Sequence, residues 1–132
     1  MRLLSTITPV VDVQKFYFTV YDDGDWANEA IPVWQTPDGK AVTITKVRSA
    51  VIGATSPALA FNIEERPSTA VGSAGTDICS GEISADADGT VTTSFSNASI
   101  AADAYLVLTT AGSAVETGTV DLIAVSIYYT VN

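Results

Sequence analysis

Residues 119–131 read TVDLIAVSIYYTV, and apolar side chains recur in this stretch at every second position. Such alternation is typical of a β-strand that turns one face towards a core. That face would carry Ile123, Val125, Ile127, Tyr129 and Val131. The opposite face, with Leu122, Ala124 and Tyr128, is only partly polar. We therefore expect this strand to lie inside a sheet or to be covered by another subunit.

The same alternation runs through most of the chain, and no helical stripe of apolar residues accompanies it. In residues 15–21, Phe16, Phe18 and Val20 share one face, and two tyrosines and a threonine share the other. Valine, isoleucine, threonine and aromatic residues favour strands, and they dominate these stretches. The pattern predicts eight strands, at residues 15–21, 31–35, 41–53, 59–64, 77–83, 91–95, 105–110 and 119–131.

Turn residues separate the predicted strands. Asp23-Gly24, Asp38-Gly39 and Asp88-Gly89 each combine an Asx-turn acceptor with a glycine that tolerates positive φ. Pro37 strengthens the second of these turns, because proline suits the position before the reversal. We expect hairpin-like reversals at all three places.

Within residues 41–53 the apolar positions change parity, from Val42 and Ile44 to Val47 and Val51. Such a change predicts a bulge, or a bend between two sheets. Eight short strands without a helix predict an all-β fold, an antiparallel β-sandwich. The irregular loops favour an eight-stranded jelly roll over an immunoglobulin-like domain, whose Cys-Trp-Cys pattern is absent.

The chain has 132 residues, 47% of them hydrophobic, which is enough for the core of one domain. We place the sandwich domain at residues 15–132. Residues 1–14 carry no regular alternation, and Pro9 and Asp12 suggest an extended N-terminal arm. Such an arm is either a loose terminus or a segment that docks on a neighbouring subunit.

The composition excludes several functions. The chain holds 15 acidic and 6 basic side chains, a net charge of -9, and no histidine. Nucleic acids and anionic membranes attract clustered lysine and arginine, so neither is expected as a partner. Without histidine there is no imidazole base, and Cys79 has no second cysteine beside it. We therefore do not expect an enzyme.

No targeting segment stands out in the sequence. Residues 1–11 are interrupted by polar residues and by Pro9, unlike a signal peptide. The longest uncharged stretch, residues 49–63, is shorter than the roughly 18 residues of a membrane-spanning helix. We expect a soluble product that is not secreted.

Two groups of carboxylates resemble loops that bind calcium: Asp22, Asp23 and Asp25 in one, and Asp86 and Asp88 in the other. Neither matches the twelve-residue calcium loop, because no glutamate follows at the required spacing. We therefore expect solvated turns and no cofactor, and we keep structural calcium as the alternative.

The aromatic residues allow a different kind of site. Trp26 and Trp34, together with several tyrosines, offer flat faces on which sugar rings stack. Packing in the core or at a subunit interface explains them at least as well. Glu64 and Glu65 are adjacent, so in a strand they point to opposite faces and cannot form a glycosidase pair.

From residue 45 onward the chain resembles the small jelly-roll domains of virion proteins in tailed bacteriophages. These domains occur as capsid decoration or cement proteins, as head fibres and as modules of tail fibres. The resemblance is carried by the strand at residues 59–64 with its Arg66-Pro67 exit, by Gly75-Thr76-Asp77, by residues 86–90 (DADGT), by residues 100–108 (IAADAYLVL) and by residues 125–130 (VSIYYT).

The resemblance implies a non-enzymatic structural protein that forms a homotrimer. We expect a capsid decoration or cement protein that binds the major capsid protein on the capsid surface after synthesis in the host cytoplasm. The alternatives are a receptor-binding or tail-fibre tip domain, and a carbohydrate-binding module.

Two sets of contact residues follow from this hypothesis. The apolar residues of the arm are expected to dock on the capsid: Leu3, Leu4, Ile7 and Val10. The aromatic excess and the half-apolar face of the last strand suggest a subunit interface at Tyr17, Tyr128 and Tyr129.

Overall fold

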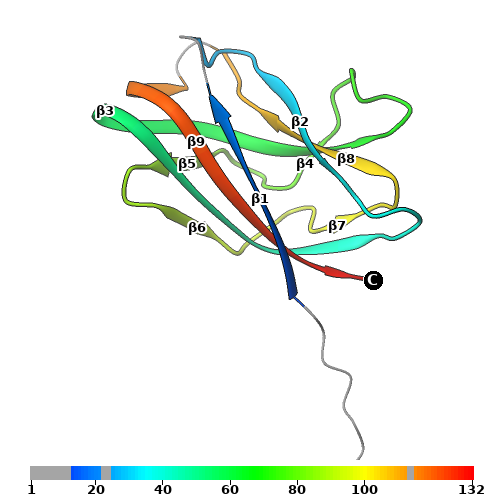
Figure 1. The fold of residues 1–132 in the computed structure, drawn as a ribbon. Coiled ribbons are helices and arrows are strands. Elements are labelled where there is room, and N and C mark those ends of the chain that lie inside the picture. The colour runs from blue at the N-terminus through cyan, green and yellow to red at the C-terminus, as the bar shows by residue number, and fades with distance from the viewer. Residues whose placement is uncertain (1–12, 22–24, 113–114) are drawn as a thin grey trace, which may run out of the picture.

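The computed structural model describes residues 13–21, 25–112 and 115–132. Over these ranges the chain forms strands and loops without a helix (Figure 1), so the predicted all-β class is confirmed. No helix in the described part of the chain could cross a membrane. The strands are β1 (Val13–Tyr21), β2 (Ala30–Gln35), β3 (Val42–Pro67), β4 (Thr76–Asp77), β5 (Ile83–Asp86), β6 (Thr90–Thr92), β7 (Ser99–Ile100), β8 (Ala104–Thr109) and β9 (Glu116–Val131).

The strands form one antiparallel, nearly closed arrangement in the order β1-β9-β3-β8-β2. The first part of β3 pairs with β9, and residues 62–67 of β3 pair with β8. We call the half with β1, β9 and the first part of β3 sheet A, which also includes β5, β6 and β7. Sheet B contains β2, β8, the end of β3 and β4.

The two ends of the strand order come together through aromatic side chains. Phe16 on β1 stacks on Trp34 of β2, with ring centroids 4.3 Å apart. In Figure 1, β3 folds back at the upper left and then runs towards β8. This antiparallel arrangement is consistent with the predicted β-sandwich.

The parity change within residues 41–53 is explained by a bulge. The register between β3 and β9 shifts between Ile44 and Lys46, so Thr45 is the extra residue. Because of this shift, Val42 and Ile44 before the bulge and Val47 after it are all buried. The predicted bulge is confirmed.

The two strands predicted at residues 41–53 and 59–64 are one continuous strand, β3. Its pairing with β9 continues on both sides of an irregular segment between Ala54 and Ala58. Thr55 and Ser56 in this segment have φ of 63° and 52°. The strand is therefore bent there rather than ended.

Two glycines allow the bent strands β3 and β9 to approach each other. A Cβ atom at Gly53 would overlap the carbonyl oxygen of Thr119. Gly118 has a φ of 65°, and a Cβ there would lie 2.7 Å from the carbonyl oxygen of Ala54. Only glycine fits both positions without a backbone shift.

The core lies between the two halves of the sheet. Trp26 is its largest side chain, 2% exposed, and its indole N–H donates a hydrogen bond to the Val120 carbonyl at 2.9 Å. Leu59, Phe61 and Ile63 of β3 are fully buried beside it. Sheet A contributes Val42, Ile44, Val47, Val51, Ile123, Val125 and Ile127, and β8 contributes Leu106 and Leu108.

The strand predicted at residues 77–83 is wrong. The short strands β4 and β5 flank this segment, and Cys79, Ser80 and Gly81 lie between them without a ladder. The Asn62 side-chain amide donates to the carbonyls of Cys79, at 2.9 Å, and Gly81, at 3.4 Å. A side chain therefore satisfies backbone groups that a strand would have paired.

The two predicted turns within the described ranges are present, but neither is a hairpin, because β2 does not pair with β3 and β5 does not pair with β6. Gly39 has a φ of 64°, and the Lys40 N–H donates to the Pro37 carbonyl at 3.0 Å. Gly89 has a φ of 93°, and its N–H donates to the Asp86 carboxylate at 3.0 Å. The turn predicted at Asp23-Gly24 lies outside the described residues.

The first strand begins slightly earlier than predicted. β1 starts at Val13, inside the segment assigned to the arm, and pairs with β9 from its first residue. Residues 1–12 of the predicted arm lie outside the described ranges.

Candidate docking face

Sheet A turns one face to the core, and we call the other its outer face: the side chains of β1, β9, β3 and β6 that point away from the core. Six large hydrophobic side chains are exposed in the described ranges. The strand register places five of these on the outer face, namely Val13, Tyr17, Tyr21, Ile52 and Val91. Exposed apolar side chains gathered on one face are typical of an interaction site.

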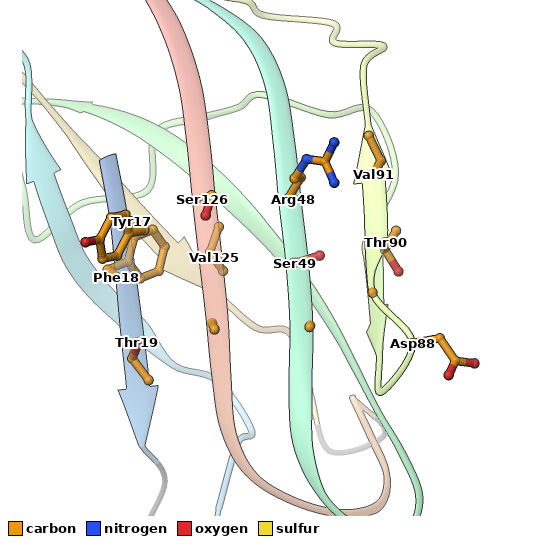
Figure 2. A pocket seen from close by; sticks show the side chains of 13 residues that line it. Tyr17, Phe18, Thr19, Arg48, Ser49, Asp88, Thr90, Val91, Val125 and Ser126 are labelled. Carbon is orange, nitrogen blue, oxygen red and sulfur yellow. The ribbon is translucent and has the colours of Figure 1, made fainter. Parts of the chain in front are cut away.

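An open groove of about 360 Å³ crosses the outer face between β1 and β6. Small side chains of the two central strands line it, Ala50 on β3 with Ala124 and Ser126 on β9. Tyr17 stands on the β1 side of the groove and Val91 on the β6 side (Figure 2). The floor of the groove is low because the outward side chains of Ala50, Ala124 and Ser126 are small, whereas Tyr17 and Val91 on the flanking strands are larger. It can receive a protruding side chain of a partner.

The outer face is also the most basic part of the chain. Lys15, Lys46 and Arg48 lie on it, which is half of the 6 basic residues in the sequence. The Lys46 ammonium lies 4.2 Å from the centroid of the Tyr128 ring, and the Lys15 ammonium lies 5.7 Å from the same centroid. The one ion pair in the described ranges joins Arg66 to Glu64, on another part of the molecule. These three cations therefore have no acidic partner among the described residues.

The structure places two of the three predicted interface tyrosines on this face. Tyr17 is 76% exposed, and Tyr128 is half-buried in the row between Lys15 and Lys46. Adjacent residues in a strand point to opposite faces, so Tyr128 and Tyr129 cannot share a surface.

Tyr129 lies in the interior, and we remove it from the predicted interface. It is 7% exposed, and its ring centroid lies 4.8 Å from that of Trp34. Its hydroxyl donates to the Gln14 side-chain oxygen at 3.1 Å. Tyr129 is thus a core residue with a satisfied polar end.

The residues predicted to dock on the capsid, Leu3, Leu4, Ile7 and Val10, lie outside the described residues. Sequence reasoning did not single out Ile52, Val91, Lys46 or Arg48 as face residues. Alternation along β3 would have grouped Lys46, Arg48 and Ile52. Val91 joins them only through the pairing of β6 with β3, which no local pattern encodes.

Carboxylates of both predicted loops accept backbone hydrogen bonds in the described part of the chain. One Asp86 oxygen accepts the N–H groups of Asp88 and Gly89 at 3.0 Å each. Asp25 likewise accepts the Ala27 N–H at 2.9 Å. No cluster of three potential ligands occurs among the described residues, and Asp22 and Asp23 lie outside them. The described carboxylates act as turn and loop acceptors.

The two tryptophans do not form a stacking platform for sugars. Trp26 is enclosed in the core, and Trp34 is sandwiched with Phe16 and Tyr129. Their ring faces are taken up by packing within the chain. The predicted platform is therefore not formed by these residues.

Glu64 and Glu65 point to opposite sides of β3, as predicted, and each supports a loop. Glu64 accepts hydrogen bonds from Arg66 at 2.8 Å and from the Gly75 N–H at 3.0 Å. Glu65 accepts the Asn97 amide at 2.9 Å and the Ala101 N–H at 2.7 Å. Both carboxylates hold irregular segments in place.

An acidic region surrounds the segment after β4. Burial raises the pKa of the Asp77 carboxyl, and the nearby Glu64 raises it further. Burial, and then Asp77, raise the pKa of Glu82. The Cys79 thiol has a raised pKa for the same two reasons, burial first and Asp77 second. A raised thiol pKa leaves little thiolate at neutral pH, so Cys79 is poorly suited to nucleophilic chemistry.

We expect the free energy of unfolding to rise when the pH is lowered from neutral to mildly acidic values. Asp77 and Glu82 have higher pKa values in the folded chain than when unfolded. As pH falls through those folded values, the folded state binds protons first, so its stability rises. The Asp77→Asn variant should melt at a higher temperature at neutral pH and gain less on acidification. Thermal unfolding followed by circular dichroism tests this, with Asp38→Asn as the matched control. An unchanged pH dependence in Asp77→Asn would contradict it.

Comparisons with known proteins provide no family assignment. No protein-family model matches the chain, and no curated protein matches it either.

Proposed function

We propose that the protein is a non-enzymatic structural protein of a tailed-bacteriophage virion. In this proposal it is a jelly-roll capsid decoration protein that forms a homotrimer on the capsid surface and binds the major capsid protein. The outer face of sheet A is the observation that carries the proposal. Tyr17 and Tyr128 lie in the subunit interface.

The exposed groups of the outer face support a structural role. Five large hydrophobic side chains stay in water in the single chain. Monomeric proteins seldom expose such gathered apolar surface unless it binds something. The groove floor, made by Ala50, Ala124 and Ser126, offers neither a nucleophile paired with a base nor a set of ligands. A packing surface fits these residues better than a catalytic one.

The virion setting rests on the resemblance in the strand and turn sequences from residue 45 onward. The all-β fold agrees with that resemblance at the level of fold class. Residues 1–12 precede β1, and in this proposal they supply the arm that contacts the capsid. Subunit contacts and capsid contacts are thus assigned to different parts of the chain.

Deleting residues 1–12 is expected to abolish capsid binding and to leave the fold intact. Every described pairing of β1 with β9 involves Val13 or a later residue, so the truncated chain keeps all of them. The test uses phage particles that lack the protein. Full-length protein should co-sediment with them and raise their melting temperature, and the truncated protein should do neither while keeping its β-rich circular dichroism.

Two results would contradict this proposal. Capsid binding by the truncated protein would show that the arm is not the anchor. Binding of full-length protein to host cells, without any effect on capsid stability, would instead favour a receptor-binding tip domain.

A further inference from the structure

We propose that the outer face of sheet A binds an acidic surface on a second copy of the chain, with Lys15, Lys46 and Arg48 as its charged contacts. The inference rests on the homo-oligomer of the proposed function and names the chemistry of its interface. It also specifies the face that one copy contributes and the charge of the surface that it meets.

The charges on the outer face contrast with those of the whole protein. The chain has a net charge of -9, although three of its cations are gathered on this face. The remainder of the chain therefore carries -12, the difference between -9 and the +3 of these cations. Lys15 and Lys46 stand on either side of Tyr128 in one row, and Arg48 lies in the next row, opposite Ser126. Asp88, the acidic residue that lines the groove, sits at its far rim (Figure 2).

The charges oppose a symmetric pairing of two outer faces that brings the cations of both copies together. Such a pairing would gather six cations, and like charges in contact oppose binding strongly. The remaining surface of a second copy has a net charge of -12, which attracts the three cations. The contact is therefore heterologous, joining two different patches, which is what a closed ring of copies requires.

The side chains of the face are arranged to present their charges to a partner. The Lys46 ammonium lies 4.2 Å from the Tyr128 ring centroid, so the ring holds the side chain down on the sheet. A lysine that is already oriented loses less freedom on binding. Tyr17 and Val91 flank the groove and contribute apolar area next to the charges.

The first experiment reverses one charge on the face and one elsewhere. Lys46→Glu places an acid opposite the acidic surface of the neighbour and should weaken self-association at least about tenfold. Lys40→Glu makes the same change in net charge at the exposed turn before β3 and should change it by less than about twofold. The dissociation constant is measured by sedimentation equilibrium over a dilution series.

The outcomes separate the inference from the proposed function. Tighter association of Lys46→Glu would indicate face-to-face pairing and overturn the inference. Unchanged association would show that the oligomer forms through another surface. In both cases the homo-oligomer of the proposed function stands. A wild-type chain that stays monomeric would remove the oligomer and the inference together.

A second experiment identifies contacts directly in the wild-type protein. Equal amounts of unlabelled and nitrogen-15-labelled chains are mixed, and lysines are coupled to carboxylates with a carbodiimide. Mass spectrometry should find mixed-isotope peptides that join Lys15 or Lys46 to an aspartate or glutamate of the other copy. If the mixed-isotope links involve Lys40 alone, the outer face is not the contact and the inference is wrong.

Discussion

Replacing Trp26 by alanine is expected to lower the free energy of unfolding by about 3–5 kcal/mol, which is a large part of the stability of a small domain. The side chain is 2% exposed and belongs to the core cluster, so its removal leaves a large cavity. The Val120 carbonyl would also lose its indole donor. A buried carbonyl without a partner adds to the cost of the cavity.

Urea unfolding followed by circular dichroism measures this effect, and two variants serve as controls. Trp26→Phe keeps most of the apolar volume and loses the hydrogen bond to Val120, so it should fall between wild type and Trp26→Ala. Tyr17→Ala removes a side chain that is 76% exposed and should change the free energy by less than about 0.5 kcal/mol. Wild-type stability of Trp26→Ala would contradict the assignment of Trp26 to the core.

The same result bears on the carbohydrate-binding alternative. If Trp26→Ala lost binding to a glycan, partial unfolding would explain the loss without any contact between Trp26 and the sugar. A glycan test must therefore use exposed aromatic residues, such as Tyr17 and Tyr21, whose removal leaves the core intact.

Replacing Gly53 by alanine is expected to cost about 3 kcal/mol. The added Cβ would overlap the carbonyl oxygen of Thr119, and a backbone atom cannot move aside as a flexible side chain does. Either β9 must shift away from β3 at this point, or the local pairing must open. Both changes weaken the largest strand pair of the fold.

Thermal and urea unfolding of Gly53→Ala should be compared with those of Gly72→Ala. A Cβ at Gly72 would meet nothing within 4 Å, and Gly72 lies in a loop outside the strands. Both variants add one methyl group, so the difference between their free energies of unfolding reports the close approach of β3 and β9. Equal stability of both variants would show that the two strands are further apart at this point.

Much of the fold could be predicted from the alternation of apolar and polar residues, because a strand with one buried face has apolar residues at every second position. Residues 15–21 correctly predicted that Phe16, Phe18 and Val20 face the core and that Tyr17 and Tyr21 face outward. The parity change after Ile44 correctly predicted the bulge at Thr45. These features depend only on the local sequence and on the two-residue repeat of a β-strand.

The features that the sequence did not reveal depend on distant partners. Two separate strands are predicted at residues 41–53 and 59–64, whereas pairing with β9 carries one strand, β3, through that region. Apolar residues at 77–83 predicted a strand, but the carbonyls of Cys79 and Gly81 accept hydrogen bonds from the Asn62 side-chain amide instead of from a neighbouring strand. In both cases a contact across the fold overrides the local preference.

The candidate face was predicted only in part, for the same reason. Tyr17 and the half-apolar row with Tyr128 follow from alternation, and the same rule should have excluded Tyr129. The groove requires β6 to lie beside β3, which brings Val91 into the same face as Arg48. The gathering of Lys15 and Lys46 around Tyr128 likewise requires the register of three strands.

The central claim is that the outer face of sheet A is buried between copies of this chain. Light scattering on a size-exclusion column at neutral pH tests it most directly, because the mass it gives does not depend on shape. We expect a particle with three times the 13.7 kDa of the single chain. A mass of one chain at every concentration would contradict the claim.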